Sequence, residues 1–258
     1  MADYLPEFMR ADVPFDKRIE RFKEIVDLCK GKVAFLGGAG VSTGSGIPDF
    51  RSKDGIYNNP DPEFARYRPE YLLSHNCYAH KPQVFYRFYR KFADIDKYEP
   101  CLVHHKLAEL ERKGTLKGVI TQNVDMLHEK AGSANVMKIH GTIGTNHCVR
   151  CGKEFSYGWF MDYPDLIPRC ECGGQAKPDV TLYDEKMPAH EYCKAMETLE
   201  DTRCLIVGGT SLQVSTAASL VANYSGEYLV IINSQPTELD RYADVCFHED
   251  INEVFGKL

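Results

Sequence analysis

Seven short runs of apolar and β-branched residues recur along the chain and predict buried β-strands. Each run is four or five residues long, which suits a strand better than a helix. The runs cover residues 32–36, 117–121, 136–140, 179–182, 204–207, 228–232 and 245–248.

Amphipathic segments lie between these runs and predict helices. In the first, apolar side chains recur every three or four residues at positions 15, 19, 22, 26 and 29, and Gly31 follows as a C-terminal cap. Residues 102–113 repeat the pattern and stop at Gly114, and residues 214–225 form a helix of small residues. Because strands and helices alternate, we expect an α/β fold with a mainly parallel sheet covered on both faces.

Two stretches interrupt this alternation. Residues 55–98 are rich in Tyr, Phe, Pro and Arg and are typical of loop and helix, and residues 144–178 contain a cysteine cluster. We expect both stretches to be insertions that together build a smaller second domain.

Composition and charge narrow the class of protein. The 258 residues are 43% hydrophobic and 26% charged, which is typical of a globular chain. With 31 basic and 37 acidic residues, the net charge of −6 argues against a protein that coats nucleic acid. No apolar run approaches the roughly 18–20 residues that span a membrane, and the first ten residues lack the layout of a signal peptide. We therefore expect a cytoplasmic protein with no membrane partner.

Four of the ten cysteines form a cluster with metal-ligand spacing. Cys148 and Cys151 are a C-x-x-C pair, and Cys170 and Cys172 precede two glycines that let the chain fold back. Disulfides are rare in a reducing compartment, so the cluster needs another explanation. Four thiolates predict one tetrahedral Zn²⁺ in a closed, structural site.

His147 is an alternative fourth ligand, because one residue rather than the more usual two separates the second pair of cysteines. The remaining six cysteines lie in helical and strand patterns, where packing is the simpler explanation. They are Cys29, Cys77, Cys101, Cys193, Cys204 and Cys246.

A glycine-rich turn follows the first predicted strand, with the sequence GGAGVSTGSGIPDFRS at residues 37–52. The spacing of its glycines matches neither the dinucleotide fingerprint nor a P-loop. A tight turn without a ligand and a turn whose N–H groups cradle a phosphate therefore both remain open. The tail of the turn, with Asp49, Phe50 and Arg51 after a proline, favours a ligand site.

Polar residues also follow four of the predicted strands, at 121–125, 140–141, 208–211 and 233–234. Open parallel sheets bind ligands at the carboxyl ends of their strands, so we expect these residues to line one cleft. His140 is the candidate acid–base residue there, because a histidine can accept a proton near neutral pH. A hydrogen-bonded core histidine is the alternative, and four more histidines offer similar rings: His104, His105, His128 and His248.

Taken together, these residues resemble the sirtuins, the NAD-dependent protein deacylases. The motifs occur in the order of that family from residue 38 to near the C-terminus. They are GAGVSTGSGIPDFRS at 38–52, TQNVDMLH at 121–128, IHG at 139–141, the four cysteines, GTSLQV at 209–214 and INSQPT at 232–237.

The resemblance implies two domains with NAD and an acyl-lysine peptide between them. Residues 1–56, 99–143 and 179–258 would form a Rossmann-like NAD-binding domain. A helical module at 57–98 and a zinc module at 144–178 would form the small domain.

The resemblance also assigns site residues. Those expected along the phosphates and the nicotinamide ribose are Gly38, Ala39, Gly40, Thr43, Phe50, Arg51, Gln122 and Asn123. Val124 and Asp125 would line the nicotinamide pocket. The adenosine half is assigned to Gly209, Thr210, Ser211, Asn233, Ser234 and Ile251, and the substrate peptide to Val180, Thr181 and Tyr183.

The implied reaction is lysine deacylation, with His140 and Asn123 as catalytic residues. The acyl oxygen would attack the nicotinamide ribose as nicotinamide leaves, and His140 would then act as general base through the ribose hydroxyls. The products would be the free lysine, nicotinamide and acyl-ADP-ribose. Protein ADP-ribosylation or NAD hydrolysis on the same fold is the alternative, and a non-catalytic NAD-responsive binding module is an alternative of another class.

Two departures from the family pattern bear on the substrate. Asp184 stands where the peptide-pairing strand usually has glycine, which adds charge beside the peptide. Tyr89 is followed three residues later by Phe92 instead of the arginine that holds acidic acyl groups. This favours acetyl or other uncharged acyl groups.

Overall fold

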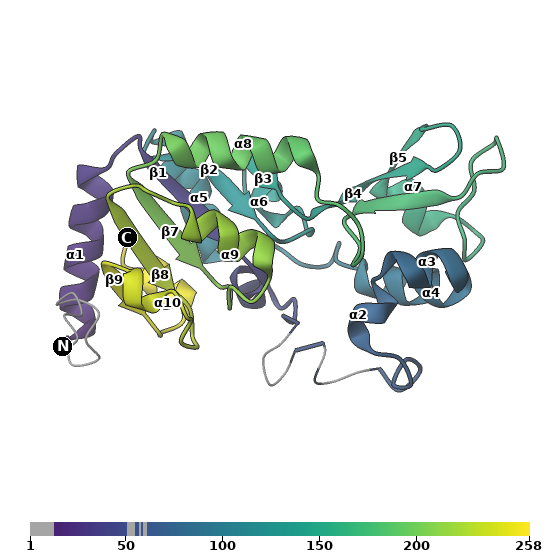
Figure 1. Cartoon of the computed structure of the whole chain (residues 1–258), viewed down its shortest axis with the longest axis horizontal. Coiled ribbons are helices and arrows are strands. Elements are labelled where there is room, and N and C mark those ends of the chain that lie inside the picture. Colours follow the sequence, from purple (N-terminus) through teal and green to yellow (C-terminus); the bar gives the residue numbers. More distant parts are fainter. Residues whose placement is uncertain (1–12, 51–54, 57, 59–60) are drawn as a thin grey trace.

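The computed structural model describes residues 13–50, 55–56, 58 and 61–258. They form two regions along the long axis of the molecule, one built on a six-stranded sheet and one on a three-stranded sheet (Figure 1). We call these the parallel-sheet region and the small region. Arg51, which the resemblance assigns to the cofactor, lies outside the described residues.

The six-stranded sheet has the order β3-β2-β1-β7-β8-β9, and every neighbouring pair is parallel. All residues of β1 and β7 are buried, as expected for strands that helices cover on both faces. The strands are β1 Val33–Gly37, β2 Leu116–Thr121, β3 Val136–Lys138, β7 Cys204–Gly208, β8 Tyr228–Ile232 and β9 Val245–Phe247.

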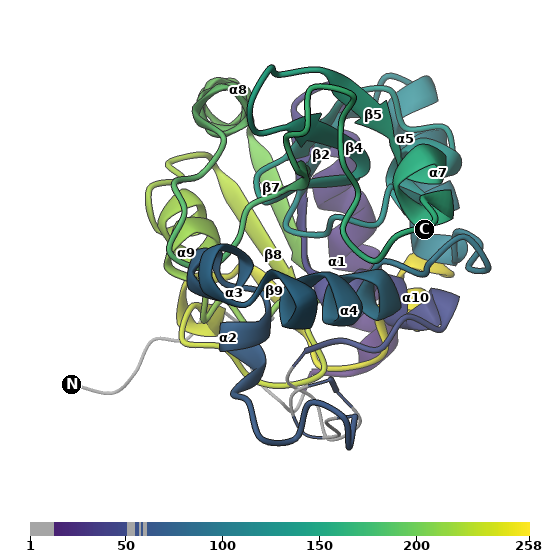
Figure 2. The same ribbon diagram turned by 90° about the vertical axis from the view of Figure 1, so that its right-hand side faces the viewer.

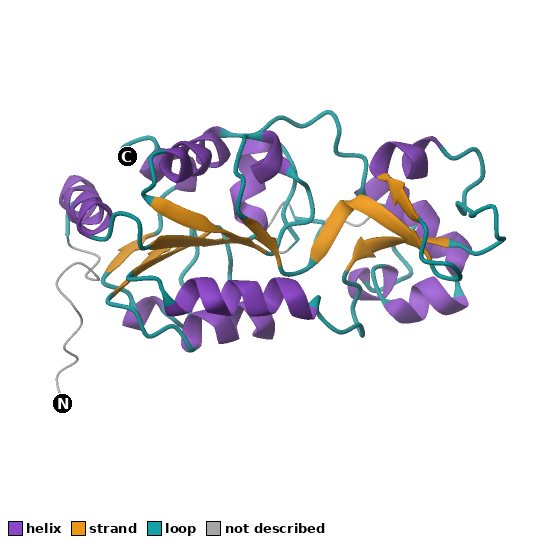
Figure 3. Cartoon of the chain, turned by 90° about the horizontal axis from the view of Figure 1, so that it is seen from above, coloured by secondary structure: helices purple, strands orange, loops and turns teal. Residues whose placement is uncertain are grey.

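Helices pack on both faces of this sheet (Figure 3). Val33 and Phe35 of β1 share a core with α1, α5 and α10, whereas Ala34 and Leu36 share a second core with α8 and α9. Successive side chains of a strand point to opposite faces, so one strand serves both cores. The predicted α/β fold is confirmed. These helices are α1 Phe15–Leu28, α5 Leu102–Arg112, α8 Ala189–Glu200, α9 Ser215–Ala222 and α10 Ile251–Phe255.

The small region contains the antiparallel sheet β5-β4-β6 and four helices (Figure 2 views the molecule from this end). Its core is aromatic: the rings of Tyr89 and Phe160 meet edge to face at 5.6 Å, and the Tyr86 hydroxyl donates to the Ala176 carbonyl. The elements are β4 Gly141–Cys148, β5 Glu154–Ser156, β6 Ala176–Val180, α2 Pro69–Leu72, α3 His75–His80, α4 Pro82–Phe92 and α7 Tyr157–Asp162.

Some elements differ from the sequence prediction. The strand predicted at 179–182 begins at Ala176, ends at Val180 and runs antiparallel to β4 in the small sheet. The run predicted at 136–140 ends at Lys138. β4 and β5 were not predicted, because β4 contains two glycines and few apolar residues and β5 is only three residues long. The boundaries of the two domains stay a prediction. No described helix combines the length and apolar character that a membrane crossing requires.

Candidate active site

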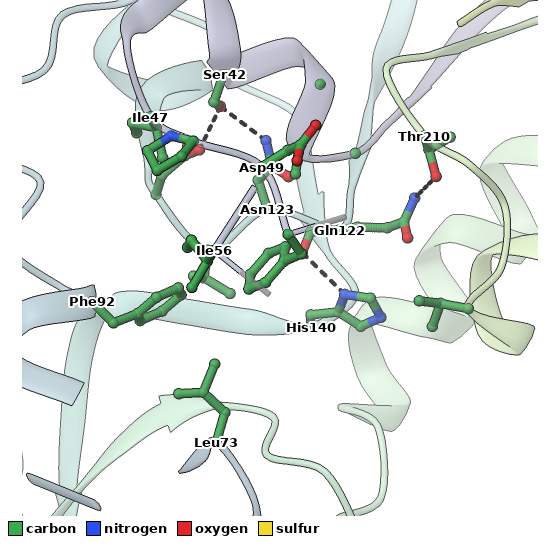
Figure 4. A pocket seen from close by; sticks show the side chains of 18 of the residues that line it. Ser42, Ile47, Asp49, Ile56, Leu73, Phe92, Gln122, Asn123, His140 and Thr210 are labelled. Carbon is green, nitrogen blue, oxygen red and sulfur yellow. Dashed lines mark hydrogen bonds between the residues drawn. The ribbon is translucent and has the colours of Figure 1, made fainter. Parts of the chain in front are cut away.

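A cavity of about 1230 Å³ lies at the carboxyl ends of the parallel strands and extends to the small region. Figure 4 shows His140 and Thr210 on its parallel-sheet side and Leu73 and Phe92 on its small-region side. Among the described residues, every cofactor and peptide residue named from the sequence lines this cavity: Gly38, Ala39, Gly40, Thr43, Phe50, Gln122, Asn123, Val124, Asp125, His140, Val180, Thr181, Tyr183, Gly209, Thr210, Ser211, Asn233, Ser234 and Ile251.

Two glycine-containing loops meet where the strand order reverses, between β1 and β7. The first continues into the 3-10 helix η2 (Ala39–Ser45). A Cβ atom on Gly38 would lie 2.7 Å from the Thr210 side chain, and one on Gly40 would lie 2.8 Å from Gly209. Glycine is therefore required for the loops to pack against each other, a reason that the sequence analysis did not consider. The cavity lies at the switch point where open α/β sheets bind their ligands.

Ser42 connects this turn to the end of β2. Its hydroxyl donates to Asp125 Oδ2 at 2.6 Å and accepts from Asn123 Nδ2 at 2.9 Å (Figure 4). Burial raises the pKa of Asp125, and the bond from Ser42 opposes that shift. Ser42 is not among the site residues that the sequence motifs predict. The feature of the sequence that could have indicated it is a serine directly after Val41 in the middle of the glycine turn. Both residues are buried in the structure.

The two side-chain nitrogens of His140 have distinct environments. Nδ1 lies 3.0 Å from the Gln122 carbonyl, which accepts only, so this nitrogen carries the proton. Nε2 is then the acceptor and lies 3.4 Å from the Thr216 hydroxyl. Burial lowers the pKa of His140, and the bond to Gln122 opposes this shift. The ring is therefore neutral at pH 7 and holds a lone pair ready to take a proton.

The four histidines named as alternatives to His140 lie outside the cavity lining. The rings of His104 and His128 are buried against each other with centroids 4.7 Å apart. Burial, together with its histidine neighbours, lowers the pKa of His104 to about 3, and burial lowers that of His128 to about 4. His105 and His248 are exposed. Of these five histidines, His140 is the one whose ring is both neutral and exposed to the cavity.

The cavity continues along the ends of β2, β7 and β8. Gln122 Nε2 donates to the Thr210 hydroxyl at 2.9 Å and so ties the β2 end to the β7 end (Figure 4). Asn233 donates from Nδ2 to the Gln235 carbonyl at 2.7 Å, which orders the loop after β8. These polar groups line the ends of strands that are neighbours in the sheet, in the order β2-β1-β7-β8.

The segment after β6 crosses between the two regions. The backbone of Tyr183 pairs with the small region, donating to the Leu73 carbonyl and accepting from the His75 amide. Asp184 has φ +71°, in the left-handed region that glycine adopts freely and aspartate more easily than most residues. Aspartate at this position, where the family usually has glycine, therefore preserves the conformation of the turn.

The four predicted metal ligands form one group at the end of β4. All four sulfur atoms lie within 4.8 Å of one another, and the pairs Cys148–Cys172 and Cys151–Cys170 are 3.4 and 3.6 Å apart. Tetrahedral zinc with Zn–S bonds of about 2.3 Å requires sulfur–sulfur distances of about 3.8 Å, so the set fits. His147 is not part of the group, because its Nδ1 lies 2.7 Å from Asp179. The cysteines fit one structural zinc.

The sequence profile of the Sir2 family matches residues 38–216. This chain belongs to the Sir2 family. A relative from Clostridium tetani, named NAD-dependent protein deacetylase, is 42% identical over 239 residues, covering 92% of this chain and 96% of its own. A relative of the same name from Cutibacterium acnes is 42% identical over 224 residues, covering 87% and 91%.

Solved Sir2 structures share the fold over nearly the whole chain. One described as the structural basis for the mechanism and regulation of Sir2 enzymes is 34% identical, with a TM-score of 0.82 and coverage of 94% of this chain and 96% of the other. A Sir2 bound to a propionylated peptide is 30% identical, with a TM-score of 0.82 and coverage of 93% and 96%. The sirtuin resemblance drawn from the motifs is confirmed.

Proposed function

We propose that this Sir2 protein is an NAD-dependent protein lysine deacylase, which transfers the acyl group of a modified lysine to ADP-ribose and releases nicotinamide. The observation that carries the proposal is the state of His140. It is a neutral base with a fixed proton position, facing a cavity that both regions line. A protein that only binds NAD needs no such base. The names of the relatives, NAD-dependent protein deacetylases, agree with this chemistry.

NAD supplies the electrophilic ribose carbon and the acceptor hydroxyls. The polar groups at the ends of β2, β1, β7 and β8 fit a long polar ligand, because these four strands are neighbours in the sheet and lie about 4.8 Å apart. The tightly packed glycine turns would hold the phosphates, and Asn233 and Ser234 the adenosine ribose. Phe50, which lines the cavity, would complete the side of the nicotinamide ribose.

His140 Nε2 would take the proton from a ribose hydroxyl when that oxygen attacks the acyl carbon. The Gln122 carbonyl keeps the proton on Nδ1 and so keeps Nε2 available. The linked side chains of Ser42, Asn123 and Asp125 would orient the ribose and the departing nicotinamide. Each carboxylate oxygen of Asp125 already accepts one hydrogen bond and retains a lone pair for an amide N–H.

We further propose that the acyl group is uncharged. Phe92, Ile143 and Leu182 give the small-region side of the cavity an apolar wall. Lys91 also lines the cavity, but its ammonium is paired with Asp61 and Glu63 at 2.8 Å each. An acidic acyl group would have to break that arrangement, whereas an acetyl group would not.

The decisive experiment measures nicotinamide release and deacylated peptide for the wild type and for His140→Ala. We expect the variant to lose about 10²–10⁴-fold in kcat, because general base catalysis contributes about this much. The matched control is His80→Ala, at an exposed position in α3, which should retain wild-type rates. Unchanged nicotinamide release by His140→Ala would contradict the assignment. Transfer of labelled ADP-ribose to protein without deacylated peptide would contradict deacylation and favour ADP-ribosylation.

We also propose that the protein works in the cytoplasm. All ten cysteines are free of disulfides, including Cys29, Cys204 and Cys246 in the parallel-sheet region. This usage suits a compartment that keeps thiols reduced.

A further inference from the structure

A second cluster of metal-ligating side chains lies outside the four-cysteine site, at the end of β9. It combines Asp240 of the 3-10 helix η3 (Asp240–Tyr242) with Cys246 and His248, and their ligand atoms all lie within 4.8 Å of one another. The three residues come from two segments, the loop after β8 and the end of β9. A thiol, an imidazole and a carboxylate together are a donor set that zinc prefers.

Two of the three distances within the cluster match the edges of a zinc tetrahedron, and the third pair of ligand atoms lies within 4.8 Å. Cys246 Sγ lies 3.7 Å from His248 Nε2, and that nitrogen lies 3.4 Å from Asp240 Oδ2. Bond lengths of about 2.3 Å for sulfur and about 2.0–2.2 Å for nitrogen and oxygen give tetrahedral edges of about 3.6 and 3.4 Å. The two edges that meet at His248 Nε2 are therefore compatible with a single ion bound by all three side chains.

Two of the ligands are held by hydrogen bonds of the kind that support bound metals. His248 Nδ1 lies 2.9 Å from the Asn233 carbonyl, so Nδ1 carries the proton and Nε2 presents its lone pair to the cluster. Asp240 Oδ1 accepts from the Thr237 hydroxyl at 2.5 Å, and Oδ2, which faces His248, accepts from the Thr237 backbone N–H at 3.0 Å and keeps a further lone pair. Metal-bound histidines nearly always donate their other N–H to a carbonyl or carboxylate.

This tautomer leaves two acceptors facing each other. The lone pair of His248 Nε2 and the carboxylate oxygen of Asp240 repel each other, and the Cys246 thiol has a single proton to place against one of them. The Arg18 guanidinium, which donates to the Cys246 carbonyl, is already paired with Glu249. A divalent cation would satisfy all three side chains at once.

We propose that Asp240, Cys246 and His248 bind a second Zn²⁺, with a fourth position open to solvent. The bound ion fastens the loop after β8 to the end of β9. Asn233, Ser234, Gln235 and Pro236 of that loop form part of the cavity wall. The second zinc therefore lies behind the adenosine end of the cavity and stabilises its wall, whereas the four-cysteine zinc stabilises the small region.

The test counts zinc in the purified full-length chain. After titration with ZnCl₂ and removal of free ion, we expect two zinc per wild-type chain and one per chain in His248→Ala. The His248 side chain is exposed, so its removal should leave the fold intact, which thermal unfolding would verify. Cys193→Ser is the matched control, since Cys193 is an exposed cysteine outside both clusters and the variant should keep two zinc. A wild type that saturates at one zinc, or a His248→Ala variant that keeps two, would overturn the proposal.

A second measurement identifies the ligands with Co²⁺ as the probe. The second equivalent of Co²⁺ should add a thiolate charge-transfer absorption in the wild type and lose it in Cys246→Ser. Thr237→Val should weaken the second zinc about 10–100-fold, as loss of a bond to a metal ligand usually does. An identical Co²⁺ spectrum in Cys246→Ser would show that another thiol is involved and would refute the site.

Discussion

The two regions of this protein reach stability by different means. The parallel-sheet region covers fully buried strands with helices on both faces, and its two cores are mostly aliphatic and phenylalanine side chains. The small region has short strands that alternate between buried and partly exposed residues, such as Ala176–Val180, and a four-thiolate group at the end of one of them. A sheet with one wet face buries less apolar surface for each residue ordered.

The small region, which has the shorter strands, is the one that contains the four-cysteine metal site. The parallel-sheet region has a hydrophobic core on each face of its sheet. In the small region, the aromatic packing of α4 on β6 is supplemented by a zinc that joins the β4 end to residues 170–172. On one side, the cavity is therefore backed by two hydrophobic cores, and on the other by a region that contains the four-cysteine zinc site.

The largest expected effect tests this dependence directly. Cys148→Ala should release the zinc and unfold the small region, because a structural zinc contributes about 10–16 kcal/mol of apparent binding free energy. Hydrogen exchange should rise in β4–β6 while β1 and β7 stay protected, and zinc per chain should fall by one. Cys193→Ser serves as control. A folded, zinc-free small region in Cys148→Ala would remove the distinction between the two regions.

Acid should destabilise the parallel-sheet region through its buried histidine pair. The folded-state pKa values of about 3 for His104 and about 4 for His128 lie below the unfolded value of 6.5, so the unfolded state binds more protons in acid. Their stabilising contribution is complete above pH 6.5 and declines as pH falls toward 4. Each should cost about 2 kcal/mol at pH 5.

Hydrogen exchange of the β1 and β2 backbone amides, measured at a series of pH values, would report this loss of stability. In His128→Leu, the slope of the free energy of unfolding against pH should be about half that of the wild type, because one of the two titrating groups is gone. This holds whatever the effect of the substitution on stability at pH 7. A slope equal to that of the wild type would show that the pair does not titrate as described.

A substitution at Gly141 tests the packing of β4 against β6, where the chain enters the small region. It has φ +78°, and a Cβ there would lie 2.0 Å from the Asp179 carbonyl oxygen in the β4–β6 pair. Gly141→Ala should lower the free energy of unfolding by about 3–4 kcal/mol, from backbone strain plus this clash. Gly132→Ala is matched, because its φ is +100° but no atom lies within 4 Å. It should cost about 1–2 kcal/mol from strain alone. Equal losses in urea denaturation would rule out the clash.

The smallest effect concerns Asp184, where the chain returns from the small region. Asp184→Gly should raise the free energy of unfolding by about 1 kcal/mol or less, because glycine adopts the left-handed conformation more easily. Asp184→Asn keeps the conformation and removes the charge. If the charge of Asp184 repels acetylated peptides whose other side chains are acidic, both variants should have a lower KM for such peptides. A KM that changes in Asp184→Gly alone would point to backbone freedom as the cause.

Much of the site was visible in the sequence because its motifs follow strands of a parallel sheet. Gln122, Asp125 and His140 follow buried strands, and topology brings all such ends to one edge. Ser42 was missed because its function depends on a contact across 81 and 83 residues of sequence to Asn123 and Asp125. The strand β4 was missed because a partner strand, rather than an apolar pattern, defines it.

By itself, the sequence determined the α/β alternation, the four-cysteine zinc ligands and the family. These features depend on local periodicity, spacing and motif order, which a chain carries before it folds. The tertiary structure decided the rest: which nitrogen of His140 is free, why Gly38 and Gly40 must lack a side chain, and that Asp240 lies beside Cys246 and His248. Those facts depend on atoms from distant segments meeting within a few ångströms, and only the packed fold sets such distances.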